Sequence, residues 1–176
     1  MLTRSILLGA ALFFAAPAFA QDNAATTSAA VDPASITEPA DFANMAAISN
    51  MFELESSTLA LERATGEEVK TFAEQMIADH TKAAQEMLPA ATEEGLTPPE
   101  DLDDRHQDML DQLSDLEGEE FDMAYIQAQV QAHDEAVALF EAYSTNGAEG
   151  PLKEFATATL PTLQMHQEHV RGLAGQ

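Results

Sequence analysis

The spacing of apolar residues is the feature that most constrains the fold of this chain. They recur at steps of three, four and seven along four long segments, about 41–65, 67–95, 119–145 and 152–173, and along a short one, about 102–116. Such steps place apolar side chains on one side of a helix. Because no segment alternates apolar and polar residues as a strand does, the sequence predicts an all-α domain.

Turn signals divide these helices into two halves. Gly66 separates the first two long helices, and the run from Asn146 to Pro151 separates the last two. Ferritin-like bundles are built from two helical hairpins joined by a connector. We therefore predict an all-α, ferritin-like four-helix bundle of two helical hairpins with a short connecting helix.

The N-terminus has the pattern of a cleavable export signal. Arg4 is followed by the apolar run 6–16 and by the small-x-small sequence Ala18-Phe19-Ala20. These are the three parts of a signal peptide. We expect residues 1–20 to be removed on export and the mature protein to be periplasmic.

The rest of the chain is expected to hold one folded domain. Residues 21–37 are rich in Ala, Thr and Ser and contain no aromatic residue, which is typical of a flexible leader. Residues 38–176 have the size of a single domain. No segment after the signal peptide has the roughly 18 uninterrupted apolar residues of a membrane span. The chain has no cysteine, so its stability must come from packing rather than from disulfides.

The charge balance narrows the range of partners. The chain has 31 acidic and 7 basic residues and a net charge of −24 at pH 7. Such a protein repels nucleic acid, which is bound mainly through Lys and Arg contacts to phosphates, and it repels anionic lipid headgroups. We expect no nucleic-acid partner, and the sequence identifies no protein partner. The carboxylates are interpreted as a solvated surface that keeps the protein soluble, with loose accumulation of cations as the alternative.

Three histidines lie within apolar helical stripes, which predicts that they are buried. They are His80, His133 and His166, and Glu53 lies on a face of small residues that leaves room for a carboxylate. Glu53 and His80 are at nearly equal distances on either side of Gly66. His133 and His166 are at similar distances on either side of the second turn. Because an α-helix rises by about 1.5 Å per residue, each long helix can supply one ligand to a common layer.

This layer predicts a metal site. A carboxylate with two or three imidazoles suits Zn, Cu, Fe or Mn. The predicted ligands are Glu53, His80, His133 and His166, with Glu55 and His169 as secondary candidates. In the alternative, the histidines are core residues that bond to carbonyl or carboxylate groups, and the protein is a non-catalytic structural or interaction module without metal.

Motifs of known enzymes are absent from the sequence. It has no G-x-S-x-G, no H-E-x-x-H and no phosphate-binding glycine loop. Di-iron proteins of the ferritin-like class use Glu-x-x-His pairs, and none occurs here. The related spacing Asp103-x-x-His106 lies on the connecting helix. The sequence therefore gives an enzymatic function no support from motifs.

Several short motifs, taken together, resemble a known family. They are Glu53-Leu-Glu-Ser-Ser-Thr-Leu-Ala-Leu-Glu62, Val69-Lys-Thr-Phe-Ala73, Met76-Ile-Ala-Asp-His80, Phe121-Asp-x-x-Tyr125 and Leu160-Pro-Thr-Leu163. In this order, between about residues 41 and 173, the chain resembles a ferritin-like family of exported bacterial proteins, domain of unknown function 4142, often labelled "predicted outer membrane protein". The resemblance implies a ferritin-like helical bundle in the periplasm and brings no established activity. No anchoring segment in the sequence supports the outer-membrane label.

Overall fold

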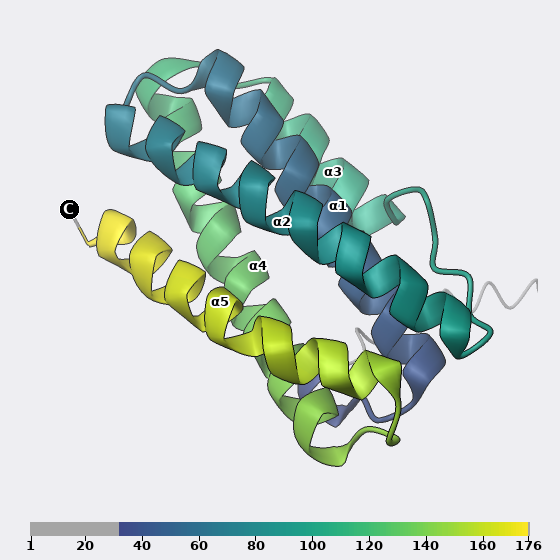
Figure 1. Ribbon diagram of the computed structural model, residues 1–176. Coiled ribbons are helices and arrows are strands. Elements are labelled where there is room, and N and C mark those ends of the chain that lie inside the picture. The colour runs from purple at the N-terminus through teal and green to yellow at the C-terminus, as the bar shows by residue number, and fades with distance from the viewer. Residues whose placement is uncertain (1–31, 176) are drawn as a thin grey trace, which may run out of the picture. The chain divides into compact units, whose positions relative to one another are not determined.

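The computed structural model describes residues 32–175, in which a short 3-10 helix precedes five α-helices (Figure 1). The elements are η1 (Pro33–Ser35), α1 (Pro39–Arg63), α2 (Glu67–Glu93), α3 (Asp104–Ser114), α4 (Gly118–Asn146) and α5 (Pro151–Ala174). This part of the chain contains no β-strand, so the predicted all-α fold class is confirmed.

The four long helices form a bundle of two hairpins (Figure 1). α1 packs against α2 and α4 packs against α5, while the two hairpins meet through α1 with α4 and α2 with α5. The connecting helix α3 lies outside the bundle, against α1 and α4. Each long helix thus has two neighbours in the bundle. Side chains that point to the bundle axis can therefore meet those of the other three long helices.

The ends of the helices follow local sequence signals. Pro39 and Pro151 lie in the first turns of α1 and α5. Backbone N–H groups in a first turn have no intrahelical acceptor, so a proline, which lacks this group, costs no hydrogen bond there. Gly95 follows α2 with a φ of +74°, which residues with a Cβ rarely adopt. α2 and α5 both continue past an internal proline, Pro89 and Pro161.

The packed domain includes residues that precede the expected boundary at residue 38. η1 contacts α4, and Ile36 is only 5% exposed in the apolar cluster of the bundle. Residues 32–37, which the sequence assigned to the leader, therefore contribute to the core through a buried isoleucine. The expected signal peptide, 1–20, and the first part of the leader lie outside the described residues.

Two apolar clusters fill the core, and a polar layer separates them. One cluster contains Phe42, whose ring stacks on Tyr143 with centroids 4.0 Å apart. The other contains Phe72 and Tyr125, whose centroids are 6.3 Å apart. Along α2, α4 and α5, one buried histidine lies between the residues of the two clusters. The core is thus interrupted by titratable groups near its middle.

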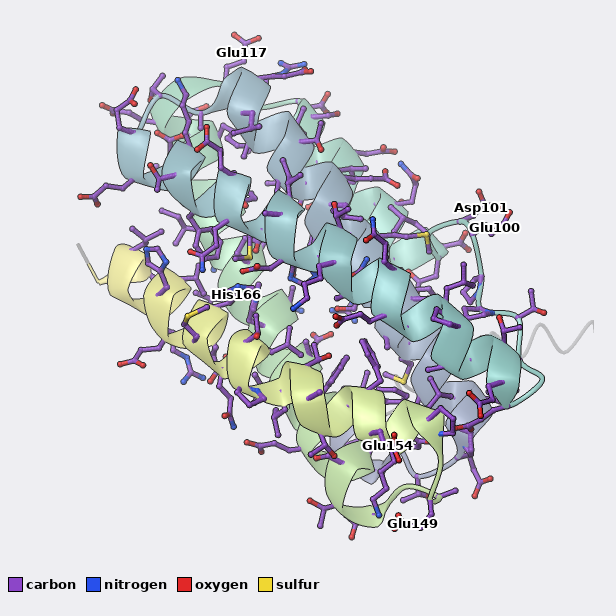
Figure 2. The ribbon with its side chains drawn as sticks, in the orientation of Figure 1. Glu100, Asp101, Glu117, Glu149, Glu154 and His166 are labelled. Atoms are coloured by element: carbon purple, nitrogen blue, oxygen red, sulfur yellow. The ribbon has the colours of Figure 1, made fainter. Side chains whose placement is uncertain are left out.

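Acidic side chains cover the outside of the bundle (Figure 2). Glu100, Glu117 and Glu149 point into solvent, whereas His166 points between the helices. Among the carboxylates of residues 32–175, Glu53 is the only one that is buried. No helix in this range has both the length and the apolar content that crossing a membrane requires.

Two carboxylates cap helices of the opposite hairpin. Asp122 of α4 accepts hydrogen bonds from Thr65 N at 3.0 Å, Thr65 Oγ1 at 2.9 Å and Gly66 N at 2.8 Å, immediately before α2. Glu94, after α2, accepts one from Leu152 N at 2.9 Å in the first turn of α5. A negative charge at a helix N-terminus is favourable. Both contacts therefore tie one hairpin to the other.

Replacing Asp122 with alanine is expected to lower the free energy of unfolding by about 1–3 kcal/mol, because it removes three hydrogen bonds to a charged acceptor. Urea denaturation of both proteins at pH 7 measures the difference. Glu74→Ala, on the exposed side of α2, is the matched control and should change it by less than about 0.5 kcal/mol. Equal stability of Asp122→Ala and wild type would show that the cap does not stabilise the bundle.

Candidate functional site

Three helices each bring one histidine to the middle of the bundle. His80 of α2, His133 of α4 and His166 of α5 are 5%, 0% and 1% exposed. Each lies on the apolar side of its helix, so packing of that side turns the imidazole inward. The ring centroids are 5.5–5.9 Å apart, and one nitrogen of each ring lies within 4.8 Å of the other two. The fold thus brings together the three histidines that the sequence placed at one level.

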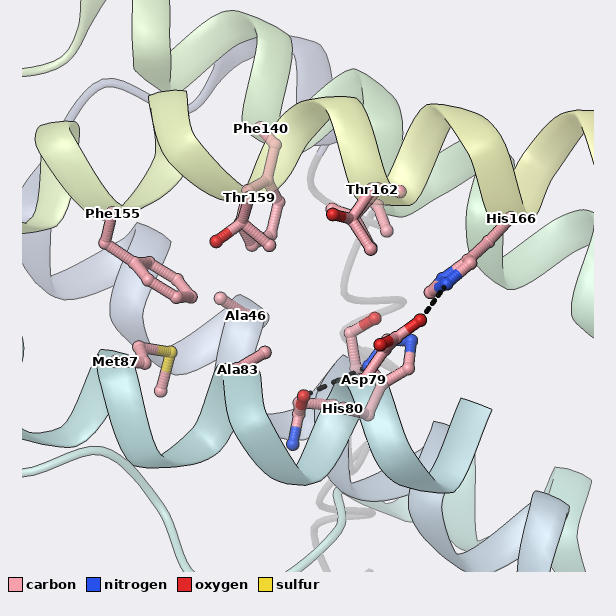
Figure 3. Close-up of a pocket in the computed structure, with 14 residues that line it drawn as sticks. Ala46, Asp79, His80, Ala83, Met87, Phe140, Phe155, Thr159, Thr162 and His166 are labelled. Atoms are coloured by element: carbon pink, nitrogen blue, oxygen red, sulfur yellow. Dashed lines mark hydrogen bonds and ion pairs between the residues drawn. The ribbon is translucent and has the colours of Figure 1, made fainter. Parts of the chain in front are cut away.

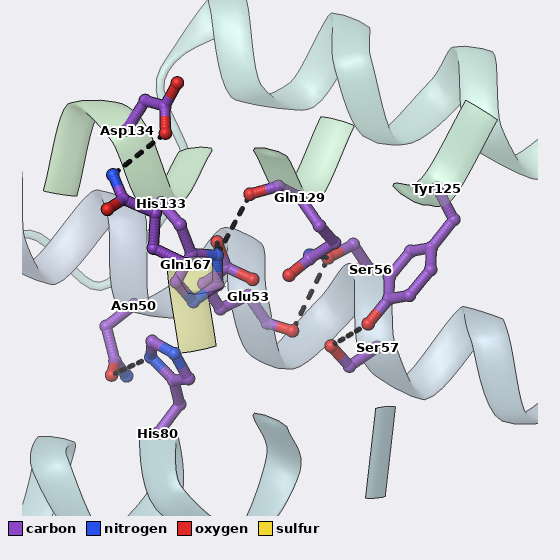
Figure 4. A network of polar contacts seen from close by, with 10 residues as sticks. All are labelled: Asn50, Glu53, Ser56, Ser57, His80, Tyr125, Gln129, His133, Asp134 and Gln167. Carbon is purple, nitrogen blue, oxygen red and sulfur yellow. Dashed lines mark hydrogen bonds and ion pairs between the residues drawn. The ribbon is translucent and has the colours of Figure 1, made fainter. Parts of the chain in front are cut away.

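Each imidazole has one nitrogen next to a hydrogen-bond acceptor (Figures 3 and 4). The three pairs are His80 Nδ1 with Asn50 Oδ1 at 3.0 Å, His133 Nδ1 with the backbone carbonyl of Gln129 at 3.0 Å, and His166 Nε2 with Asp79 Oδ2 at 2.9 Å. A carbonyl, amide or carboxylate oxygen can only accept, so the ring nitrogen beside it carries the hydrogen. These partners fix the tautomer of all three rings.

The other nitrogen of each ring has no partner. Within residues 32–175, no group forms a hydrogen bond with His80 Nε2, His133 Nε2 or His166 Nδ1, and all three atoms are buried. Each is the lone-pair nitrogen of its tautomer, so the three cannot bond to one another. A buried acceptor without a donor costs about 1–3 kcal/mol. Each ring thus has a lone pair free for a ligand, and one nitrogen of each ring lies within 4.8 Å of the other two, so the arrangement suits a single cation shared by the three rings.

Burial keeps two of these rings neutral. It lowers the pKa of His80 well below the ordinary value of 6.5, and the proximity of His133 and His166 lowers it further. Burial also lowers the pKa of His166, although Asp79 partly opposes this shift. Only a neutral imidazole can donate a lone pair to a metal ion. The protonation states at pH 7 thus agree with the role of ligand.

Glu53 lies beside the ring of His133, next to its Nδ1. Its Oε1 is 3.6 Å from that atom, whereas the partnerless nitrogen of the same ring is Nε2. Neither carboxylate oxygen of Glu53 has a hydrogen-bond partner among the described residues. Burial raises the pKa of Glu53, while His133 and the side chain of Gln129 lower it in part. The structure therefore places this carboxyl group next to the histidines, outside the group of ligand atoms that lie within 4.8 Å.

A line of polar contacts extends from this layer along α1 and α4 (Figure 4). Gln129 Nε2 donates to Ser56 Oγ at 3.1 Å. The hydroxyl groups of Ser57 and Tyr125 are 2.8 Å apart. All four residues are buried. These contacts join α1 to α4 and so fix the helix that carries Glu53 relative to the helix that carries His133.

The two secondary candidates lie away from the histidine cluster. Glu55 is exposed on α1. His169 is exposed on α5, and its ring packs against Phe72 with centroids 5.2 Å apart. His106 serves a local purpose, because its Nδ1 is 2.6 Å from Oδ1 of Asp103, the residue that caps α3.

Sequence reasoning did not identify the three groups that orient the imidazoles. Gln129 could have been found, because it lies four residues before His133, where its carbonyl can reach the ring. Asp79 directly precedes His80 in sequence, yet it bonds to His166 of another helix. Asn50 lies one turn before Glu53 and bonds to His80 of α2. The last two pairings depend on which helices are neighbours, which the sequence does not state.

Comparison with known proteins identifies the fold but no activity. Residues 23–173 match the family described as Domain of unknown function (DUF4142). A DUF305 fragment from Deinococcus radiodurans superposes with a TM-score of 0.68 and 17% identity, over 78% of this chain and 95% of that chain. A DUF305 protein from Streptomyces coelicolor superposes with a TM-score of 0.64 and 18% sequence identity, over 77% of this chain and 89% of that chain. No curated protein matches the sequence.

Proposed function

The chain belongs to the DUF4142 family, and from its buried histidines we propose that it binds one transition-metal ion through His80, His133 and His166. The observation that carries the proposal is the set of three partnerless lone-pair nitrogens, one from each ring. A metal-binding histidine almost always donates its other N–H to an acceptor, which orients the ring and raises its basicity. Each of the three rings has such an acceptor.

The ligand set favours zinc or copper. Three imidazoles without a thiolate suit Zn and Cu, and they suit Fe as well, whereas Mn prefers carboxylate and water oxygens. Nitrogens bound at about 2.0–2.1 Å around a tetrahedral ion lie roughly 3.4 Å apart. One nitrogen of each ring lies within 4.8 Å of the other two, close enough for small side-chain movements to reach that spacing. Three protein ligands leave one coordination position open.

In this proposal Glu53 balances charge and does not itself ligate the ion. A divalent ion with three neutral imidazoles adds two positive charges to the core. A buried carboxyl group within 3.6 Å of the His133 ring is in a position to compensate part of that charge as carboxylate. The sequence predicted Glu53 as a direct ligand, and its position beside Nδ1 favours the indirect role.

We further propose that the protein acts in the periplasm in metal handling or stress protection. The pattern of residues 1–20 supports export. The competing function is a metal-free structural or interaction module. One observation favours it, namely that each histidine already has a hydrogen bond in the core.

The metal content of the protein distinguishes these two functions. After periplasmic isolation and reloading with zinc or copper, mass spectrometry is expected to find about one ion per chain. His80→Ala/His133→Ala should reduce this to near zero, because a single remaining imidazole holds an ion weakly. His169→Ala, which removes an exposed histidine outside the cluster, should retain the full amount. A content far below one in wild type, unchanged in the double variant, would favour the metal-free module.

A further inference from the structure

A pocket adjoins the histidine cluster on one side (Figure 3). Its wall includes His80 and His166, together with Ala83 of α2 and the rings of Phe140 and Phe155. The cavity volume is about 30 Å³. One water molecule needs about 10–15 Å³ on this scale, so the pocket has room for about two non-hydrogen atoms.

The pocket contains hydroxyl groups but no cationic side chain. Thr159 and Thr162 of α5 direct their hydroxyl groups into it, and Figure 3 shows no bond from either to another lining residue. The only charged side chain in the wall is the carboxylate of Asp79, which is 36% exposed and is bonded to His166. No lysine or arginine lines it. The pocket therefore disfavours anions and provides hydrogen-bond donors to a neutral guest.

We propose that this pocket admits a neutral ligand of two non-hydrogen atoms, such as a diatomic gas or hydrogen peroxide, to the open coordination position of the metal. This inference rests on the proposed metal site at His80, His133 and His166. Three observations carry it: the pocket shares its wall with two of the three ligands, its volume matches two atoms, and its polar groups are uncharged apart from Asp79.

Size and charge exclude other occupants of the pocket. A substrate with more than about three non-hydrogen atoms exceeds the volume of the pocket, whose wall includes the rings of Phe140 and Phe155. A small anion in the pocket lies near the carboxylate of Asp79, in the wall, on a chain with a net charge of −24. A neutral diatomic molecule meets neither obstacle.

Carbon monoxide on the copper(I)-loaded protein tests the proposal. Copper(II) lies at the top of the affinity order of divalent ions for nitrogen sites, so it is expected to load. Reduction with ascorbate then gives copper(I), and infrared spectroscopy detects the carbon monoxide bound to it through its stretching band. The wild-type protein should give one such band. Ala83→Leu fills the pocket and should reduce the band at least tenfold at unchanged copper content. Ala158→Leu, the same change on the exposed side of α5, should leave the band intact.

A second variant covers the case in which Ala83→Leu disturbs the fold. Thr159→Val preserves side-chain size and removes one hydroxyl group, so it should retain copper and shift the stretching frequency. If copper-loaded wild type gives no band, or if Ala83→Leu leaves the band unchanged, the pocket proposal is wrong while the metal site stands. Failure of the wild type to load copper or zinc overturns the metal site itself, so the two failures are distinguishable.

Discussion

Removing the metal from the loaded protein is expected to lower its thermal midpoint by roughly 8–16 °C. An ion that binds only the native state stabilises it by about 4 kcal/mol when its free concentration is 1,000 times the dissociation constant. For a domain of this size, each kcal/mol shifts the midpoint by about 2–4 °C. The physical source is the relief of the three partnerless nitrogens of His80, His133 and His166. Circular dichroism during heating, with and without EDTA, gives the shift.

Variants assign this stabilisation to the cluster. His166→Ala removes one of the three ligands and should abolish most of the difference between metal-loaded and chelated samples. His169→Ala lies three residues further along α5 and is exposed, so it should show the same difference as wild type. Identical melting of wild type with zinc, with copper and with EDTA would contradict a metal site in the core.

The metal-free protein is expected to lose unfolding free energy, by up to about 3 kcal/mol, between pH 7.5 and pH 5.5. The pKa values of His80 and His166 are lowered in the folded state from 6.5, mainly by burial. As the pH falls below 6.5, these histidines bind protons in the unfolded chain but stay unprotonated in the folded protein. The stability that the two neutral rings contribute is fully present above pH 6.5. Below pH 6.5, the contribution of each ring falls by up to about 1.4 kcal/mol per pH unit.

Glu53 acts on stability with the opposite sign. Its folded pKa is raised above 4.5, so the folded protein holds a proton that the unfolded chain releases in the window between these two values. Stability from this group grows as pH falls through that window. Glu53→Gln removes the titration and should make the loss of stability in acid steeper. His133, His169 and the carboxylate of Asp79 are the other titratable groups near these rings.

Urea denaturation at both pH values measures these effects. His80→Asn retains a side-chain N–H for Asn50 but cannot take up a proton. Because the pKa of His80 is lowered further than that of His166, this variant should remove at least half of the loss. Because Glu53 opposes the effect of the histidines, the decisive protein is Glu53→Gln: a stability of this variant that does not change between pH 7.5 and pH 5.5 would show that neither His80 nor His166 is held neutral by burial. A loss that persists in full in His80→Asn would exclude His80 as a source.

The sequence by itself determined the helices and the level of the histidines. Apolar spacing located all five α-helices, because an amphipathic helix must bury one side wherever it packs. Equal distances from the turns placed His80, His133 and His166 in one layer, because hairpin geometry and a fixed rise per residue leave little freedom. The sequence left both Glu53 and Glu55 as candidates. Residues two apart on a helix point to nearly opposite sides, and the structure buries Glu53 and exposes Glu55.

Only the tertiary structure decided what each side chain meets within that layer. Periodicity gives the side of a helix and leaves the side-chain torsions open, so it did not reveal that Glu53 turns to Nδ1 of His133. The bond of Asp79 to His166 and that of Asn50 to His80 both depend on which helices are adjacent. The pocket beside the cluster depends on the joint packing of four helices. The orientation of a side chain, its hydrogen-bond partners and the shape of a pocket are set by several chain segments together. No single segment of the sequence therefore determines them.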